Sequence, residues 1–461
     1  MIGEKDYLTA DIHKTEWASA TCDRYDYLIA VFCGGMAGLI DVFFIGDPVT
    51  SKLGKATDQA ADELVKKAAQ LFWQADPRQS GKNRKRPQSL EQCISYLEQA
   101  FPVNYDARYA KDLVVEDGVL SGMRPLNHHL LSLAHSPDPI GLICSIINQW
   151  MGYATFVDNG RLIHAVPGKN SGAIPYLQGS NFPSMLFCGF VNWIGHLLSD
   201  LSGSSSTRKA GKTGRGAGIP IPFYELFLAC EFGSIDGKTL ADNMIQVFEK
   251  GYDLRFGAAM AIPVILEEMM IRALWMIRQR FVRKKSWKES YPSSAHADLR
   301  IMLITGNATL CIIDGADAAV HGLAGGNFVS FICHLNLIGW ARLVMLVLKE
   351  LAIRLGPVAD QIIERFWDEM ANHLTPAERE RIHAFYERMQ EYDQYLDLLL
   401  TEYAKQVEKE YRELYQEIQE TFRDDTSASE RAEHSVRLAE TAGVKEEKIV
   451  RSLDDLDDLF L

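Results

Sequence analysis

The sequence predicts an all-α protein: a polytopic helical membrane bundle with a C-terminal cytoplasmic tail of amphipathic or coiled-coil helices. Long apolar blocks interrupt a chain of 461 residues. Most blocks approach the ~20 residues that a helix needs to cross a bilayer core. Tryptophans fall toward the block ends, as aromatic residues do at membrane interfaces. A large soluble helical core is the alternative, but soluble helices are usually shorter than these blocks.

The blocks divide the N-terminal part of the chain. Residues 1–26 are polar, and residues 27–355 form the predicted helical membrane domain, with a cytoplasmic insertion at 47–126. We expect crossing helices at 27–46, 139–157, 182–201, 256–277, 301–320 and 328–351. Residues 219–232, which open with IPIPF, are short for a crossing. They therefore either cross the membrane or form a re-entrant segment.

The chain changes character after the last block. Residues 356–422 are rich in charge, and their apolar side chains recur at three- and four-residue steps. Thr375 and Pro376 form a good N-cap and first-turn pair, with Glu378 three residues after Thr375. We expect a coiled coil or helical hairpin that makes a homo-oligomer or recruits a protein partner. Residues 423–461 are polar and acidic, as in disordered tails.

Basic clusters predict the orientation. The segment 278–288 reads RQRFVRKKSWK, residues 82–86 read KNRKR, and residues 208–215 add further basic side chains. Short basic loops stay in the cytoplasm. We therefore expect the loop 279–300 and the tail from 352 to be cytoplasmic and the acidic N-terminus to lie outside. The predicted protein is a multi-pass protein of the cell inner (plasma) membrane, in contact with membrane lipid.

Composition narrows the function further. The net charge is −13 and the pI is about 5.5, an excess of acid that argues against nucleic acid as the main partner. The eight cysteines form no CxxC pair and lie mostly inside apolar runs. Cysteine in such a setting acts as a small apolar residue, so we expect reduced thiols instead of disulfides.

One polar pair stands out on an apolar helix. Residues 192–206 read NWIGHLLSDLSGSSS, in which His196 and Asp200 are four residues apart and share a helical face. Histidine and aspartate are costly inside a membrane and face a partner or a polar cavity when they occur there. The simpler interpretation is that Asp200 only accepts a hydrogen bond from His196.

Other polar residues lie at neighbouring block ends. One aspartate comes late in the first block, and NHHLLSLAHSPD at 127–138 precedes the second. Under the predicted topology all these groups lie at the cytoplasmic ends of three helices. Histidines and carboxylates at one level are typical ligands of zinc, manganese or a two-metal site. The candidate ligands, of which His128 and His129 are alternatives, are Asp41, His128, His129, His135, His196 and Asp200.

Further candidates are weaker. The loop 202–218 carries hydroxyl, lysine and arginine side chains that could contact an anionic substrate; its candidates are Ser204, Ser205, Ser206, Arg208 and Lys212. Asp314, Asp317 and His321 share a helical face and either line the same cavity or pair with Arg300 or one another. Glu267 and Glu268 interrupt the fourth long block, and at least one should face the interior.

Three motifs resemble a known family. GGMAGLIDVFF at 34–44, HHLLSLAHS at 128–136, and GHLLSDLSGSSS at 195–206 followed by GIPIPF resemble, in the same order, the motifs of the LexA-binding, inner-membrane-associated metal-dependent hydrolases. The resemblance covers residues 27–225, with a long insertion at 47–120. It departs at Ile40, where the family has proline, and at Phe43, where the family has a second aspartate. It implies a bacterial inner-membrane protein with a metal site.

Together these observations predict a membrane-embedded metal-dependent hydrolase. It would act on an ester or phosphoester, such as that of a lipid, at the cytoplasmic face. The rival is a non-enzymatic membrane scaffold, sensor or channel-like effector that works through its C-terminal helical tail.

Overall fold

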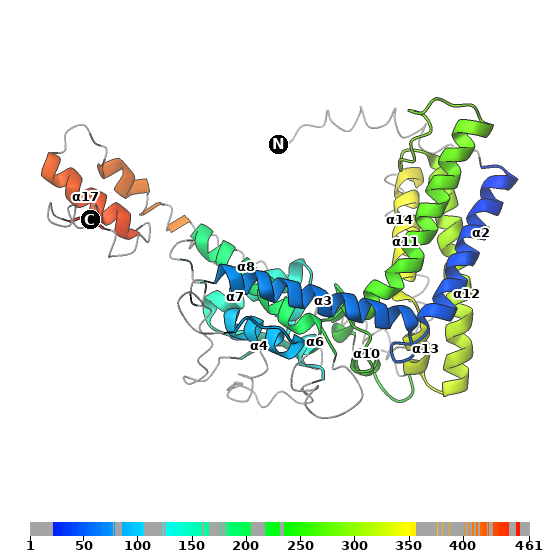
Figure 1. Ribbon diagram of the computed structural model, residues 1–461, viewed down its shortest axis with the longest axis horizontal. Helices are drawn as coiled ribbons and strands as arrows, with labels where there is room; N and C mark the ends of the chain where they lie inside the picture. Colours follow the sequence, from blue (N-terminus) through cyan, green and yellow to red (C-terminus); the bar gives the residue numbers. More distant parts are fainter. Residues whose placement is uncertain are drawn as a thin grey trace.

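The computed structural model describes residues 22–76, 85–105, 126–158, 161–165, 182–203, 217–230, 235–355 and 427–441, with scattered positions elsewhere. The chain is mostly helical, as predicted. Figure 1 shows two groups of helices: a bundle of long, roughly parallel helices, and a second group whose helices run across the foot of that bundle. The predicted tail at 356–422 and the loop 204–216 lie almost entirely outside the described residues.

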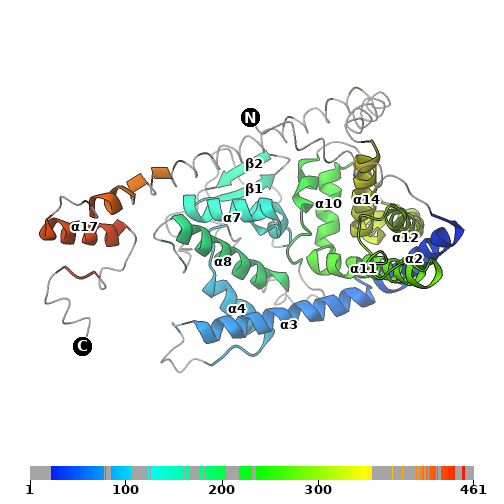
Figure 2. The same ribbon diagram turned by 90° about the horizontal axis from the view of Figure 1, so that it is seen from above.

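Four long helices make the bundle, and they lie side by side in Figures 1 and 2. Helix α2 (Arg24–Ile40) starts at a capping box on Asp23 and continues as the π-helix η1 (Asp41–Ile45). Helix α11 (Leu254–Ile277) continues as η5 (Arg278–Val282). Helices α12 (Ala297–Gly325) and α14 (Leu337–Leu355) follow, joined by the short α13 (Phe328–His334).

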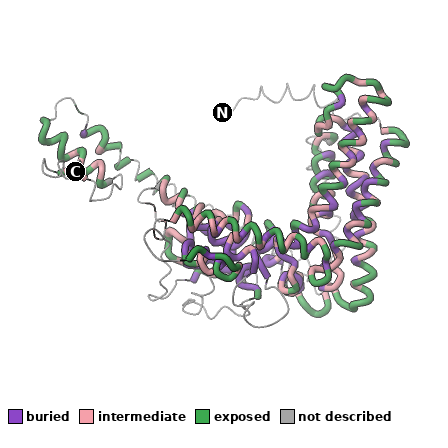
Figure 3. Tube along the Cα trace, in the orientation of Figure 1, coloured by how far each residue is buried: buried purple, intermediate pink, exposed green. Residues whose placement is uncertain are grey.

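The bundle contains the segments that fit a membrane. Arg24–Ile45 and Ala297–Gly325 are each long and apolar enough to cross one, and α13 with α14 is a third candidate if this pair, bent by 73°, is one broken span. Buried residues face the inside of the bundle and exposed residues its outside (Figure 3). Many of the exposed side chains are large and apolar, for example Phe32, Phe43, Ile312 and Met345, as a lipid-facing surface requires.

Glycine sets the closest approach in the bundle. A Cβ placed on Gly34 of α2 would lie 2.1 Å from the carbonyl oxygen of Gly306 on α12, and one on Gly38 would lie 2.9 Å from Ile313. Gly34 and Gly38 are four residues apart, the small-residue spacing that lets membrane helices pack backbone to backbone.

The second group surrounds a hairpin and holds the largest buried cluster. It contains α3 (Lys52–Ala75), α4 (Leu90–Ala100), α6 (His128–Leu131), the 3₁₀ helix η3 (Leu133–His135), α7 (Pro139–Met151), α8 (Phe182–Leu201), η4 (Tyr224–Ala229) and α10 (Leu240–Glu249). Strands β1 (Ala154–Asp158) and β2 (Arg161–Ala165) pair antiparallel, with Ala154 opposite Ala165. Val103, Leu130, Phe156 and Phe248 are among the buried side chains that fill this core.

Several predicted crossings are corrected by this arrangement. Residues 139–157 form a helix of only 13 residues that ends at the left-handed Gly152 and is followed by a strand; such a helix is about 20 Å long, shorter than a ~30 Å bilayer core. In the described part of 219–232, residues 219–230, the only helix is the 3₁₀ helix Tyr224–Ala229, whose six residues are too few to cross a membrane. Helix α8 has 20 residues but lies between α4 and α7 in the second group.

The N-terminus and the basic loop do not lie at opposite ends of the bundle, as the sequence predicted. Arg278 and Arg283, which follow α11, form ion pairs with Asp26 in the first turn of α2. The N-terminus and the basic loop 279–300 therefore lie at the same end of the bundle, although the sequence predicted opposite sides. The sequence-based topology counted 139–157, 182–201 and 219–232 as three crossings between α2 and α11. An odd number of crossings there places the start of α2 on the side opposite to the basic loop, whereas with none the two lie on the same side.

The glycine contact yields a stability prediction. Gly34→Ala should lower the stability of the protein in detergent by about 1–3 kcal/mol or more, because the new methyl group collides with a backbone that cannot rotate away. Gly35→Ala is the matched control, since a Cβ there meets nothing within 4 Å. That variant should be neutral or gain up to about 1 kcal/mol from helix propensity. Thermal unfolding measures both; equal midpoints for the two variants would contradict the proposed packing.

The ends of the bundle yield a topology prediction. A cysteine at Lys288 in the basic loop and one at Lys55 on α3 should react with an impermeant thiol reagent from opposite sides of the membrane, since α11 is about 36 Å long and separates the two ends. The half-exposed Cys22 and Cys188 are first replaced by serine. Labelling of both probes from one side would show that α11 does not span.

Candidate metal centre

Helix α8 supplies two of the clustered side chains. His196 and Asp200 are one turn apart, and His196 Nε2 lies 3.2 Å from Asp200 Oδ2. The helix is fixed against the histidine segment by Trp193, whose indole Nε1 donates to the carbonyl oxygen of Ala134 at 3.0 Å. A Cβ on Gly195 would lie 2.3 Å from the ring of Phe101, so glycine allows the helix to sit this deep.

The short helices before α7 supply the other two. His129 comes from α6 and His135 from η3, and their Nε2 atoms lie 3.4 and 3.5 Å from Asp200 Oδ2. The Nδ1 atom of His129 hydrogen-bonds the carbonyl oxygen of Gly218 at 3.1 Å. This bond places a proton on Nδ1, so Nε2 is the ring atom that faces Asp200 and is available to a metal.

Three of these side chains form a group that could hold a metal ion, and His196 lies beside it. One atom each of His129, His135 and Asp200 lies within 4.8 Å of the others, and His196 Nε2 is 3.2 Å from His135 Nε2. Metal bonds of ~2.0–2.2 Å in a tetrahedron give ligand separations of about 3.3–3.6 Å, close to the observed contacts. Asp200 Oδ2 is buried and accepts no well-formed hydrogen bond, although three imidazole nitrogens surround it. These side chains could hold a metal ion.

Burial controls the charge of the cluster. The exposed fractions are 3% for His129, 0% for His135, 1% for His196 and 5% for Asp200. Burial, and then the neighbouring His129 and His196, hold the pKa of His135 well below its usual value. Burial pushes the pKa of Asp200 upward, but the imidazoles of His196, His129 and His135 outweigh it and hold that pKa well below its usual range. A neutral imidazole and an ionised carboxylate are the protonation states that bind metal.

Tyr105 forms one wall of the cluster. Its ring meets those of His135 and His196 edge to face, with centroids 5.2 and 5.6 Å away. Its hydroxyl lies 2.7 Å from the Ser145 hydroxyl of α7. The tyrosine thus limits rotation of two imidazoles.

The other predicted residues are distributed differently. Asp41 is not in the cluster; it accepts a hydrogen bond from Asn336 at the foot of the bundle. The rings of His128 and His129 are tilted by 50°, with centroids 3.9 Å apart, but the convergent group of three does not include His128. Ser204, Ser205, Ser206, Arg208 and Lys212 lie outside the described residues.

The weaker candidates on α12 are also separate from the cluster. Asp314 accepts hydrogen bonds from the backbone of Asn336 and from Trp340. Asp317 and His321 pair with each other, with Nδ1 and Oδ2 3.4 Å apart, and Arg300 pairs instead with Glu350. A second convergent group in the described part of the chain, Glu417, Glu420 and His434, is at least partly exposed.

Glu225 was not among the site residues predicted from the sequence. This buried residue of η4 contacts the Ser136 hydroxyl at 2.7 Å, and Asp138 contacts the same hydroxyl at 2.7 Å. A hydroxyl has one proton to donate, so one of the two carboxyls must be protonated and donate to Oγ. Asp138 already accepts from the backbone of Gly141 and Phe223. Burial, and then the charge of Asp138, raise the pKa of Glu225 to about 8. Only its position after IPIPF hinted at a role.

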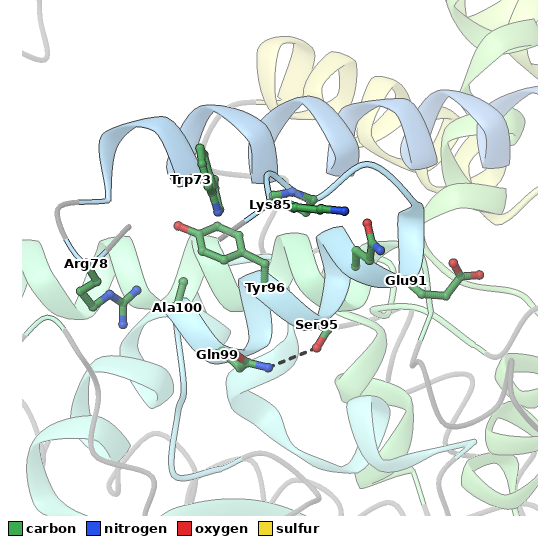
Figure 4. A pocket seen from close by; sticks show the side chains of 10 residues that line it. Trp73, Arg78, Lys85, Glu91, Ser95, Tyr96, Gln99 and Ala100 are labelled. Carbon is green, nitrogen blue, oxygen red and sulfur yellow. Dashed lines mark hydrogen bonds between the residues drawn. The ribbon is translucent and has the colours of Figure 1, made fainter. Parts of the chain in front are cut away.

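A surface cavity in the described part of the chain lies apart from the histidine cluster. A cavity of about 670 Å³ opens between α3 and α4 and is lined by Trp73, Arg78, Lys85 and Tyr96, among others (Figure 4). Arg78 and Tyr96 both contact Asp76, at 2.8 and 3.1 Å. Its lining shares no residue with the histidine cluster, so this hollow is not an entrance to it.

The protonated state of Glu225 can be tested through stability. A carboxyl whose pKa rises from about 4.5 to about 8 on folding binds more protons in the folded state. Stability is then lost as the pH rises through this window. Glu225→Gln, a neutral isostere, should flatten the decline between pH 5 and 8 in thermal unfolding experiments. An unchanged pH dependence would mean that Glu225 is ionised.

No family model, no characterised protein and no solved structure matches this chain.

Proposed function

We propose that this chain is a membrane-embedded metal-dependent hydrolase that acts on an ester or phosphoester, such as that of a lipid. The observation that carries the proposal is the convergence of three imidazole nitrogens on one buried oxygen of Asp200 at 3.2–3.5 Å. Histidine and carboxylate ligands suit zinc, and manganese is the second candidate.

The ligand set leaves room for chemistry. His129, His135 and Asp200 form the tight group, and three protein ligands are the usual number in catalytic zinc sites. A metal bound there would supply Lewis-acid activation of water, lowering its pKa toward ~7. His196, 3.2 Å from both His135 and Asp200, would stand beside the open position. Glu225 would hold a proton close to this group, because it contacts the hydroxyl of Ser136, the residue that follows His135.

The cluster and the basic loop lie at opposite ends of α11. The carbonyl of Gly218 accepts from His129 while its N–H donates to Asp253, the N-cap of α11; the basic loop follows the other end of the same helix. The positive-inside rule applies to short loops and assigns this loop, with the C-terminal tail, to the cytoplasm. The centre would then serve the opposite face, in place of the cytoplasmic face that the sequence predicted.

A structural metal in a non-enzymatic scaffold is the second candidate, and one observation favours it. All four polar side chains are at least 95% buried, and four protein ligands with no open position are typical of structural zinc sites. In that case the C-terminal helical tail, through self-association or a protein partner, would be the working part.

Metal content and hydrolysis separate the candidates. The purified full chain should contain about one zinc or manganese ion, and His129→Ala should lower its affinity tenfold or more. His196→Ala is the discriminating variant: an enzyme should keep its metal and lose hydrolysis of an activated phosphodiester, whereas a four-ligand structural site should lose metal and stability. His434→Ala is the control for adventitious binding at the partly exposed group and should change neither. A metal-free wild-type chain after growth with added zinc and manganese would refute both.

A further inference from the structure

The interior of the bundle carries three carboxyl groups without a basic partner. Asp41 of η1, Glu267 of α11 and Asp314 of α12 have exposed fractions of 3%, 0% and 1%. Within the described residues no lysine or arginine forms an ion pair with any of them. The arginines that act electrostatically on Glu267, Arg342 and Arg272, both form ion pairs with Glu268. Buried acids between candidate membrane helices are costly and mark functional groups.

Asp41 and Asp314 form a contacting pair. Their carboxyls are within hydrogen-bonding reach of each other. Asn336 donates to Asp41 from Nδ2 at 2.6 Å and to Asp314 from its backbone at 2.9 Å, and Trp340 donates to Asp314 at 2.8 Å. Two touching carboxylates cannot both be ionised in a water-poor interior, so they share a proton. The surrounding groups are N–H donors, which stabilise one negative charge and would repel a metal cation.

The surroundings of Glu267 require a proton on its carboxyl group. Its Oε2 accepts a hydrogen bond from Asn307 Nδ2 at 2.8 Å, but its Oε1 and the Asn307 Oδ1 have no hydrogen-bond partner. A Cβ on Gly306 would lie 2.0 Å from Oε1, so this oxygen packs directly against the α12 backbone. That space holds no coordination shell, whereas a proton on Glu267 removes the buried charge and supplies the missing donor.

The groups follow one face of α12. Asn307, Cys311, Asp314, Asp317 and His321 step by three or four residues, and Asn307 and Asp314 are about 10.5 Å apart along the axis. Cys311 lies within electrostatic range of all three carboxyls. The stripe opens at His321, whose side chain is 46% exposed and pairs with Asp317. It ends at Glu267, because the next layer toward the basic loop is the apolar cluster of Ile271, Trp275, Met302 and Leu303.

We propose that the bundle is a proton-binding element, which takes up protons at its His321 end and holds them on the Asp41–Asp314 pair and on Glu267. The titratable or charged groups that face these sites are Asp317, Tyr252, Cys33, Cys311, Glu268, Arg272 and Arg342. The apolar layer above Glu267 makes the stripe a one-sided path, so the site loads from one face and does not conduct. The inference does not depend on the metal centre.

Infrared spectroscopy of the full chain in detergent tests the proposal. Protonated carboxyls give a C=O stretching band that ionised ones lack. The wild type should show this band at pH 7.5, and Glu267→Gln and Asp314→Asn should each remove part of it. Glu268→Gln is the matched control one residue away: this acid forms ion pairs with Arg272 and Arg342, so the band should remain.

Glu225 contributes to the same band, so the spectra are compared in a Glu225→Gln background, in which any remaining band reports on the bundle. Absence of the band at pH 7.5 in this folded background would overturn the proposal, as would a band that neither neutral substitution reduces. The path is tested by transfer into heavy water, which shifts the band as the protons exchange. Asp317→Leu should slow this exchange severalfold; an unchanged rate would overturn entry through the His321 end.

Discussion

The carboxylate of Asp200 is the constraint on which the second group of helices depends. It is buried, ionised, and contacted by three imidazoles from three separate helical segments. A buried charge is tolerated only when other groups compensate it. The packing of α6, η3 and α8 therefore depends on how the charge of Asp200 Oδ2 is compensated. Tyr105, Trp193 and Gly195 each serve this arrangement by limiting where the rings and the helix can lie.

Helical periodicity made part of this centre predictable. The i, i+4 spacing of His196 and Asp200 sufficed to place both on one face, and the helical class of the chain followed from its apolar blocks. The choice between His128 and His129 could not be made, because it rests on a hydrogen bond to Gly218, 89 residues away. Asp41 was misassigned since its position at a block end resembled those of the true cluster, while its partner Asn336 lies 295 residues further on.

Apolar length proved a poor guide to membrane crossing. Helix α8 and the 139–157 block are as apolar as a span, yet they are covered by protein: α8 by α4 and α7, and the β1 strand by the core around Phe156. The sequence carries no sign of which surface covers an apolar block, lipid or protein. Glu225 and Glu267 show the same limit for polar groups. Their burial arises from distant packing partners, and neither lies in a motif of its own.

Gly218 links the histidine cluster to the start of α11. The carbonyl oxygen of Gly218 accepts a hydrogen bond from His129, and the N–H of Gly218 donates one to Asp253. Asp253 caps α11 and forms an ion pair with Arg255. A side chain at Gly218 would approach Asp253 Oδ2 to 3.1 Å and the Leu201 carbonyl to 2.9 Å, so the link tolerates little displacement. Glu267 lies fourteen residues after Asp253 on the same helix. The hydrogen bond of His129 to Gly218 and the packing of Glu267 against Gly306 therefore constrain the same helix, one at its foot and one near its middle.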